Sequence, residues 1–204
     1  MLIIEPKLYL GEGNQRTVYS HPEDATLCIK IIKPNSEVAV KRQLREVKYY
    51  KLLKRKKISF ANISQYLGEQ VTDKGVGYLY EKVLDFDGQL SEGLEQSLRE
   101  LGPESEESAK LIAKVQQLGM FIKKNKIIFH DYLIRDNKNV LCRKEQDGSY
   151  TPIIVDALGD TAFIDIMAWS KKQTDKRITR KWNKFLVDPM VKLLPWVQRD
   201  DLEI

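Results

Sequence analysis

The sequence predicts an α+β protein, with a sheet-rich N-terminal region and a mainly helical C-terminal region. Short apolar segments separated by turn residues dominate the first 84 residues, one long helical segment interrupts them, and helical apolar spacing returns after residue 104. With 204 residues, 42% of them hydrophobic, the chain is long enough to bury a core. We expect two parts of one domain, residues 1–84 and residues 85–204.

The N-terminal region is expected to hold a five-stranded antiparallel sheet and one helix. Three strands lie within residues 7–33, with glycines at the first turn and the sequence HPED at the second. A helix over residues 36–56 follows Pro34, with Ser36 or Asn35 as its cap. The last two strands, over residues 63–71 and 76–83, are joined by TDKG, a sequence typical of hairpin turns.

The C-terminal region is expected to be mainly helical. Residues 84–102 are acidic and look like a connection, and a helix follows with apolar residues spaced by three and four. A loop over residues 130–139 leads to a hairpin of residues 140–144 and 151–160. Two further helices are expected near residues 162–172 and 179–194. The apolar residues of the first helix are Leu111, Ile112, Val115, Leu118 and Ile122.

Charge is segregated along the chain, and this limits the classes of partner. Residues 41–57 carry nine basic side chains against one acidic, residues 84–108 carry eight acidic against one basic, and residues 171–184 carry seven basic against one acidic. Such basic segments are either solvated helix faces or surfaces for phosphate-rich partners. Nucleic acid is disfavoured, because Trp169, Trp182 and Phe185 fit a core better than a stacking surface.

Targeting and cysteine usage indicate a cytoplasmic protein. No run of about 18 apolar residues is present, and the N-terminus lacks the pattern of a signal peptide. The two cysteines, Cys28 and Cys142, form no CxxC pair, so neither a zinc site nor a disulfide framework is expected.

The first turn carries a glycine pattern. Gly11 and Gly13 match the first two glycines of the GxGxxGxV phosphate-binding turn, and Val18 matches its closing valine. Because glycine lacks a Cβ, backbone N–H groups can approach phosphate oxygens there. Arg16 stands where the third glycine would be. A simple hairpin turn is the alternative interpretation.

Lys30 interrupts the most apolar strand of the N-terminal region. Side-chain alternation puts it between Cys28 and Ile32, and the opposite face of the strand is apolar too, so the ammonium needs an anionic partner. That partner is a bound phosphate or a structural ion pair. Glu46 is the only carboxylate in the core of the following helix, and we expect it to pair with Lys30. A solvated glutamate among lysines is the alternative.

The loop of residues 130–139 offers groups that phosphate transfer uses. In kinase-type loops a carboxylate orients the attacking hydroxyl and an amide oxygen binds Mg²⁺. Asp131 and Asp136 are the carboxylates, Asn137 and Asn139 are the amides, and no pair has the usual HxDxxxxN spacing. We favour Asp131 with Asn139, because Asn139 directly precedes a strand; a loop without catalytic geometry is the alternative.

Asp156 ends an apolar strand at the place where a DFG motif supplies a metal ligand, although the glycine follows three residues later and not two. A turn or cap residue is the alternative. A glycine turn, a strand lysine, a helix glutamate, an Asp/Asn loop and a strand-end aspartate follow one another in the order of a protein-kinase-like two-lobed fold. Since only 48 residues follow Asp156, we expect a reduced C-lobe.

The chain also resembles a bacterial family, the PhoP-regulatory-network protein YrbL family, nearly from end to end. The resemblance is carried by HPEDATLCIKI, REVKYY, GVGYLYEKVLDFDG, NKII, NVLC and AWSK. It implies a protein-kinase-like fold and a role in bacterial regulation under a magnesium-responsive two-component system.

Three functions are therefore predicted. The first is a small atypical kinase that binds ATP and Mg²⁺ between its lobes and transfers phosphate to an unknown hydroxyl acceptor. Gly11, Gly13, Val18, Lys30 and Glu46 would bind the nucleotide, Asn139 and Asp156 the metal, and Asp131 would orient the acceptor. The second is a pseudokinase or adaptor that acts by binding a regulatory partner. The third is a protein whose basic helices contact RNA or an anionic membrane.

Overall fold

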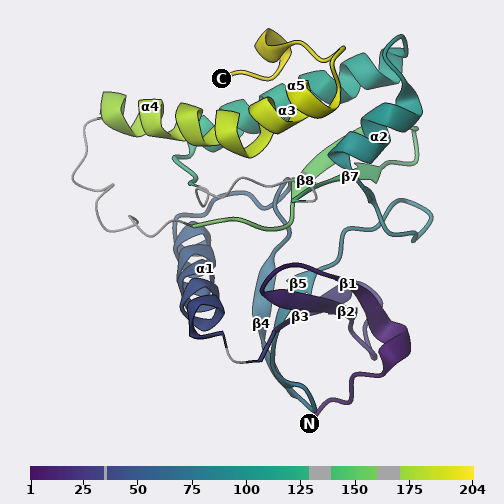
Figure 1. Ribbon diagram of the computed structural model, residues 1–204, viewed down its shortest axis with the longest axis vertical. Helices are drawn as coiled ribbons and strands as arrows, with labels where there is room; N and C mark the ends of the chain where they lie inside the picture. Colours follow the sequence, from purple (N-terminus) through teal and green to yellow (C-terminus); the bar gives the residue numbers. More distant parts are fainter. Residues whose placement is uncertain (35, 129–138, 160–170) are drawn as a thin grey trace. The chain divides into compact units, whose positions relative to one another are not determined.

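The computed structural model (Figure 1) describes residues 1–34, 36–128, 139–159 and 171–204. These residues divide into two compact units: unit 1 comprises residues 1–60 and 64–83, and unit 2 comprises residues 61–63 and 84–204. Helices and strands are mixed in the chain, which confirms the predicted α+β class. Among the described residues, no helix combines the length and the hydrophobicity needed to span a membrane.

Unit 1 is built on a five-stranded antiparallel sheet, as predicted. Its strand order is β1-β2-β3-β5-β4, so the last two strands form a hairpin whose second strand pairs with β3. A short 3₁₀ helix, η1 (Pro6–Leu8), precedes the first strand. The strands are β1 (Tyr9–Glu12), β2 (Arg16–Ser20), β3 (Leu27–Ile32), β4 (Tyr66–Thr72) and β5 (Gly75–Glu81).

Helix α1 (Glu37–Arg55) packs on one face of this sheet (Figure 1). Ser36 caps it, because its hydroxyl accepts a hydrogen bond from the backbone N–H of Ala39 at 3.2 Å. The helix turns a buried stripe towards the sheet and leaves its many basic side chains outside. The buried residues of α1 are Ala39, Gln43, Glu46, Val47, Tyr49, Tyr50 and Leu53.

The N-terminal segment covers the other face of the sheet. Leu2 and Ile4 form a buried apolar cluster with Ile29 and Ile31 of β3. On this face the neighbouring strands β3 and β5 leave no room for a side chain at Gly77, because an added Cβ would lie 2.3 Å from a methyl carbon of Ile29. One face of β3 is therefore covered by α1 and the other by the N-terminal segment, which explains why its four central residues are all buried.

Unit 2 begins with two elements that the sequence did not predict. Residues 84–102 were expected to be a connection, yet they contain strand β6 (Glu92–Gly93) and helix α2 (Leu94–Leu101). Leu94 and Leu98 lie one helical turn apart and are fully buried. The acidic residues around this apolar pair led to the prediction of a connection instead of a helix. β6 pairs with β7 (Val140–Lys144), which forms the expected hairpin with β8 (Tyr150–Ile154). Residues 61–63 belong to unit 2 because Ile63 bridges Ile154.

Among the remaining helices of unit 2, the first agrees with the prediction, whereas the last begins earlier and is less regular than expected. Helix α3 (Glu106–Lys124) has the predicted apolar stripe, with Leu111, Val115, Leu118 and Ile122 buried. The helix expected at residues 179–194 begins earlier: α4 (Lys171–Trp182) continues into a π-helical turn, η3 (Asn183–Val187), and into α5 (Asp188–Leu193). A short 3₁₀ helix, η4 (Arg199–Asp201), lies near the C-terminus. Most of the helix expected at residues 162–172 lies outside the described residues.

Candidate functional site

Strand register gathers several predicted residues on the face of the unit 1 sheet that meets α1. Lys30 of β3 lies opposite Val18 of β2 and Tyr78 of β5, and the side chains of such cross-strand partners share a face. Two residues away, Cys28 lies opposite Tyr80. Only 6% of Lys30 is exposed, which confirms that this lysine is buried in the strand.

Glu46 of α1 is at the centre of a polar network on the same face. Its carboxylate accepts a hydrogen bond from Arg16 at 2.9 Å and another from the hydroxyl of Tyr80 at 2.7 Å. Gln43, one turn earlier on α1, accepts from Arg16 at 2.7 Å and donates to Tyr80 Oη at 2.8 Å. The Glu46 side chain is 4% exposed, so the carboxylate is buried among its partners.

The ion pair that the structure gives Glu46 is thus with Arg16, a partner that the sequence did not assign. Arg16 begins β2, and its guanidinium reaches the carboxylate from the position of the missing third glycine. Lys30 joins the network through an aromatic ring, because its Nζ lies 4.3 Å from the centre of the Tyr80 ring. Burial, and next the charge of Glu46, hold the pKa of Tyr80 well above its ordinary value, so this phenol stays a neutral donor.

The glycine turn shows open space and no local need for glycine. Gly13 N–H donates to the Arg16 carbonyl at 2.9 Å and closes the turn between β1 and β2, and Gly11 lies opposite Val18. An added Cβ on Gly11 or Gly13 would meet no atom within 4 Å. Neither glycine has the left-handed φ that would exclude other residues. Within the described residues, therefore, neither packing nor backbone conformation requires glycine at these two positions.

In unit 2, Asn139 and Asp156 lie at the same end of the β7–β8 hairpin. The N–H of Val155, the neighbour of Asp156, donates to the Asn139 carbonyl at 2.9 Å, directly beyond the Val140–Ile154 pair. The two residues that the sequence predicted as metal ligands are thus neighbours on paired segments. Asp131, Asp136 and Asn137, the other residues of the predicted loop, lie outside the described residues.

The backbone after Asp156 is strained. Ala157 has a φ of 70°, which an L-residue with a Cβ rarely adopts, and its N–H donates to the Asp156 carboxylate at 2.6 Å. Gly159, which also has a positive φ of 86°, donates its N–H to the Ile128 carbonyl at 2.8 Å. Strain of this kind is concentrated at functional sites, because packing must hold it in place.

The donor chemistry fits a magnesium ion that shares its ligands with phosphate. Among the described residues there is no cluster of three or more His, Cys, Asp or Glu that could hold a metal by itself. Asn139 and Asp156 offer an amide oxygen and a carboxylate, and Mg²⁺ commonly takes one or two protein oxygens together with water and substrate phosphates. These two residues could therefore supply only part of the ligand set of such an ion.

Sequence reasoning missed Arg16, Gln43 and Tyr80. Two signals were present: Gln43 precedes Glu46 by three residues and so shares its helix face, and Tyr80 falls on the Lys30 face of the sheet once β3 and β5 are paired. Arg16 was noticed only as a departure from the glycine pattern.

Comparison with known proteins matches the chain to one protein family. The model of the family described as PhoP regulatory network protein YrbL matches residues 2–190. The protein YrbL of Escherichia coli (strain K12) is 32% identical to the chain over 189 residues, which cover 93% of this chain and 88% of that protein. YrbL of Shigella flexneri matches with the same identity and coverage.

Proposed function

The chain belongs to the PhoP regulatory network protein YrbL family, and from this premise we propose that it binds ATP with Mg²⁺ as a small kinase-like protein in a bacterial regulatory circuit. The observation that carries the proposal lies within unit 1. A buried lysine, a second cation from Arg16 and an open glycine turn belong to one short stretch of antiparallel sheet.

Each of these features suits a phosphate group. The space at Gly11 and Gly13 lets an anion approach the backbone N–H groups of the turn, and Val18, opposite Lys30, offers an apolar surface to a base or ribose. Lys30 supplies an ammonium at low exposure, where water screens its charge only weakly. Glu46 is held by Arg16 and Tyr80, and both of these also bond to Gln43.

The remaining roles follow the order of motifs along the chain. In this proposal Asn139 and Asp156 supply the protein oxygens for Mg²⁺, which would neutralise phosphate charge when bound. Asp131 orients the hydroxyl of the acceptor and takes its proton. Transfer would then depend on the position of the reacting groups and on charge neutralisation, without a covalent enzyme intermediate.

A second function has its own observation. Arg16 replaces the third glycine and forms an ion pair with Glu46, and the loop of residues 130–139 departs from the HxDxxxxN spacing. Both departures favour a pseudokinase, which binds nucleotide or a regulatory partner and transfers no phosphate. The two functions share the nucleotide site and differ only in the chemical step.

Thermal melting with ATP and Mg²⁺ tests the shared site. We expect the melting temperature to rise with ATP concentration, because a ligand that binds only the folded state stabilises it by mass action. Lys30→Met should remove the part of the rise that depends on Mg²⁺, while its side chain keeps most of the buried volume. Lys74→Met, on the exposed turn between β4 and β5, removes the same charge and should keep the rise.

A lack of any ATP-dependent shift in the parent protein would refute the nucleotide site for both functions. If the shift is present, phosphate transfer or ATP turnover separates them. Loss of turnover in Asp131→Asn with an unchanged ATP shift supports the kinase, whereas a parent protein that binds ATP without turnover is a pseudokinase.

A further inference from the structure

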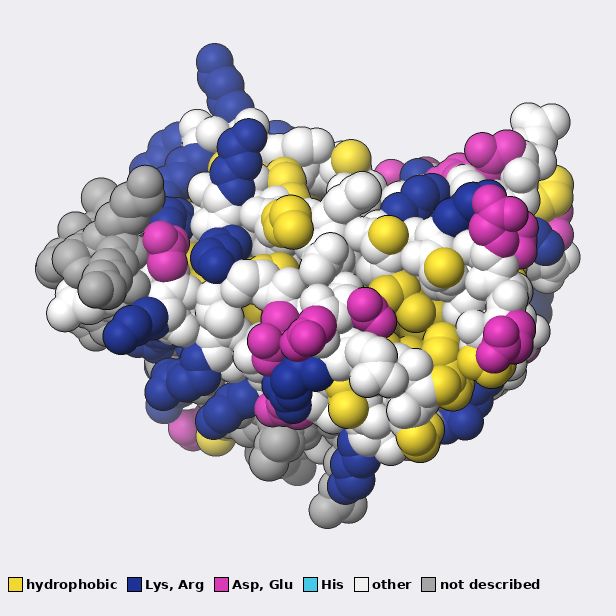
Figure 2. All heavy atoms as spheres, turned by 90° about the horizontal axis from the view of Figure 1, so that it is seen from above, with side chains coloured by type: hydrophobic (Ala, Val, Ile, Leu, Met, Phe, Trp, Pro, Cys, Tyr) yellow, Lys and Arg dark blue, Asp and Glu magenta, His cyan; other side chains and the backbone are white. Residues whose placement is uncertain are grey.

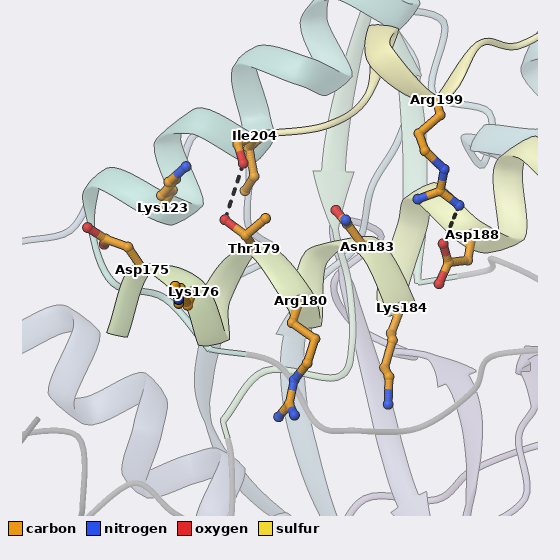
Figure 3. A pocket seen from close by; sticks show the side chains of 10 residues that line it. All are labelled: Lys123, Asp175, Lys176, Thr179, Arg180, Asn183, Lys184, Asp188, Arg199 and Ile204. Atoms are coloured by element: carbon orange, nitrogen blue, oxygen red, sulfur yellow. Dashed lines mark hydrogen bonds and ion pairs between the residues drawn. The ribbon is translucent and has the colours of Figure 1, made fainter. Parts of the chain in front are cut away.

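A separate feature of unit 2 is an open groove of about 1010 Å³ along α4 and η3, far along the chain from the residues discussed above (Figure 3). Its lining includes one face of α4, a residue of α3 and residues of the C-terminal segment. Five of the ten lining side chains are basic and two are acidic. They are Lys123, Asp175, Lys176, Thr179, Arg180, Asn183, Lys184, Asp188, Arg199 and Ile204, and we call this feature the basic groove.

The acidic side chains of the basic groove are already engaged. Asp175 forms an ion pair with Lys126, which lies two residues after the end of α3, and Asp188 accepts from Arg199 at 2.7 Å. In contrast, within the described ranges, no ion pair involves the other four basic side chains of the lining. These four are Lys123, Lys176, Arg180 and Lys184. The groove therefore carries positive charge that the described protein groups do not neutralise.

Three of these cations are arranged by the helix itself. The interval between successive cations is four residues, or about 6 Å along the axis of an α-helix. The three residues are Lys176, Arg180 and Lys184. All three are exposed, and Figure 3 shows Arg180 and Lys184 extending in the same direction. In the space-filling view of Figure 2, many Lys and Arg side chains lie exposed at the protein surface. Neighbouring like charges on one helix are unfavourable without an anion, so their arrangement favours a ligand.

Tight packing fixes the wall that bears these cations. Trp182 is fully buried, and its Nε1 donates to the Leu202 carbonyl at 2.8 Å. At Gly119 of α3, an added Cβ would lie 2.8 Å from the Trp182 ring and 2.6 Å from Ile204, so the two helices and the C-terminal segment are in close contact. Thr179 Oγ1 donates to the Ile204 carbonyl at 3.2 Å. The backbone that bears the basic side chains is therefore anchored to α3 and to the C-terminal segment by packing and hydrogen bonds.

We propose that the basic groove binds a soluble ligand that carries two or more phosphate groups. Its volume lies at the upper end of the range for small-molecule sites, about 300–1,000 Å³. Arg and Lys together provide the charge-assisted hydrogen bonds that phosphates accept. A single-stranded nucleic acid would use exposed aromatic side chains, but Trp182 and Phe185 are buried. A membrane surface would use apolar side chains, and among the described residues of the lining Ile204 alone is apolar.

Calorimetric titration of the full chain with inorganic tripolyphosphate tests this site. The measurement uses a Lys30→Met background without Mg²⁺, so that the proposed nucleotide site of unit 1 does not contribute. We expect saturable binding that weakens with rising salt, because exposed charges are screened. The double variant Arg180→Ala with Lys184→Ala should bind roughly tenfold more weakly or worse.

The matched control removes one arginine and one lysine from α1, with Arg45→Ala and Lys48→Ala, both exposed positions of unit 1. It should change the affinity by less than about twofold, since an exposed charge that does not line the groove is screened by salt. An equal loss in both double variants would show that only net charge matters and would overturn the site. No tripolyphosphate binding by the parent would do so as well.

Two further titrations identify the source of the phosphates. Equal affinity for ATP and tripolyphosphate, lost together in the groove variant, shows that the groove binds phosphates alone; tighter binding of ATP shows that it also contacts the nucleoside. An RNA oligonucleotide that binds more tightly than either ligand, and depends on Arg180 and Lys184, would replace the small ligand with a nucleic acid. Because this test needs no Mg²⁺ and no Lys30, its result is independent of the proposed kinase-like site.

Discussion

Each unit contains a helix that packs against a neighbouring element of the same unit. The two contacts differ in the charged side chains that they bury. Between α1 and the sheet of unit 1, the carboxylate of Glu46 is 4% exposed and meets the guanidinium of Arg16, which is 18% exposed. Between α3 and α4 of unit 2, Gly119 and the fully buried Trp182 make a close apolar contact, and the cations of the basic groove remain at the surface.

The difference shows what each contact contributes. Burial of a charged pair costs desolvation energy that the pair only partly recovers, and apolar residues of similar size would often give equal stability. The polar network of unit 1 is therefore poorly explained by stability and better explained by the position it gives to Lys30 and Glu46. The contact in unit 2 stabilises the fold through packing, which leaves its exposed cations available for a ligand.

The largest expected effect comes from Glu46→Ala in unit 1. Removal of this carboxylate takes away the anionic partner of the Arg16 guanidinium and the acceptor of the Tyr80 hydroxyl, and we expect the free energy of unfolding to fall by about 3–5 kcal/mol. Urea unfolding measures it. Adding Arg16→Met to this variant should restore part of the lost stability, because the unpaired charge of the guanidinium is then removed. If the effects of the two substitutions simply add, Arg16 and Glu46 are not energetically coupled and the prediction is wrong.

The two close glycine contacts offer a matched comparison of packing. Gly77→Ala places a Cβ 2.3 Å from Ile29 in unit 1, and Gly119→Ala places one 2.8 Å from Trp182 in unit 2. We expect each to cost about 1–3 kcal/mol of unfolding free energy. Gly119→Ala should cost less, because alanine favours the helix by about 1 kcal/mol. Gly13→Ala, with open space at its Cβ, serves as the control in urea unfolding and should change little.

The two buried thiols are expected to make the free energy of unfolding depend on pH in alkaline solution. Burial raises the pKa of Cys142 in unit 2 from 9.0 to about 12, and Asp85 adds to this while a hydrogen bond from Ser97 opposes it. Burial also raises the pKa of Cys28 in unit 1, where the nearby ammonium of Lys30 opposes the rise. In both cases the folded state holds the thiol proton more tightly than the unfolded chain does.

The sign of the pH effect follows from that difference. At a pH below its pKa in the unfolded chain, each thiol makes its full contribution to stability. This contribution is lost as the pH rises towards the pKa of the thiol in the folded protein. Relative to Cys142→Ala, the parent should therefore lose about 1 kcal/mol of unfolding free energy per pH unit above about pH 9. Urea unfolding at several pH values measures the slope, and parallel curves for parent and variant would contradict the prediction.

The smallest expected effect concerns the exposed ion pairs of unit 2. Arg199 pairs with Asp188 at 2.7 Å and with Glu203 at 3.0 Å, and all three side chains are more than one third exposed. We expect Arg199→Ala to change the unfolding free energy by roughly 0–1 kcal/mol. A loss comparable to that of Glu46→Ala would remove the contrast between the two units.

Most of unit 1 could be predicted from local patterns. The five strands, the capped helix and the burial of Lys30 depend on alternation, turn residues and a capping serine, which are properties of short segments. The partner of Glu46 could not be predicted in this way. Arg16 and Lys30 both lie on the face of the sheet that meets α1, and only the packing of α1 determines which cation reaches the carboxylate.

In unit 2, local patterns identified α3 and the β7–β8 hairpin, but not α2, whose short apolar pair becomes meaningful only against a neighbouring surface. The adjacency of Asn139 and Asp156 also required strand pairing. Likewise, the basic segment of residues 171–184 was evident, whereas the wall that α3 and the C-terminal residues add to it was not.

The sequence alone determined the α+β class, the family membership and the residue types that phosphate binding requires. These depend on composition, periodicity and similarity, which need no coordinates. The tertiary structure decided the contacts of those residues: the Arg16–Glu46 pair, the Tyr80 ring beneath the Lys30 ammonium, and the groove beside α4. Such contacts join residues far apart in the chain, and their distances are set by the packing of whole elements, which no local pattern encodes.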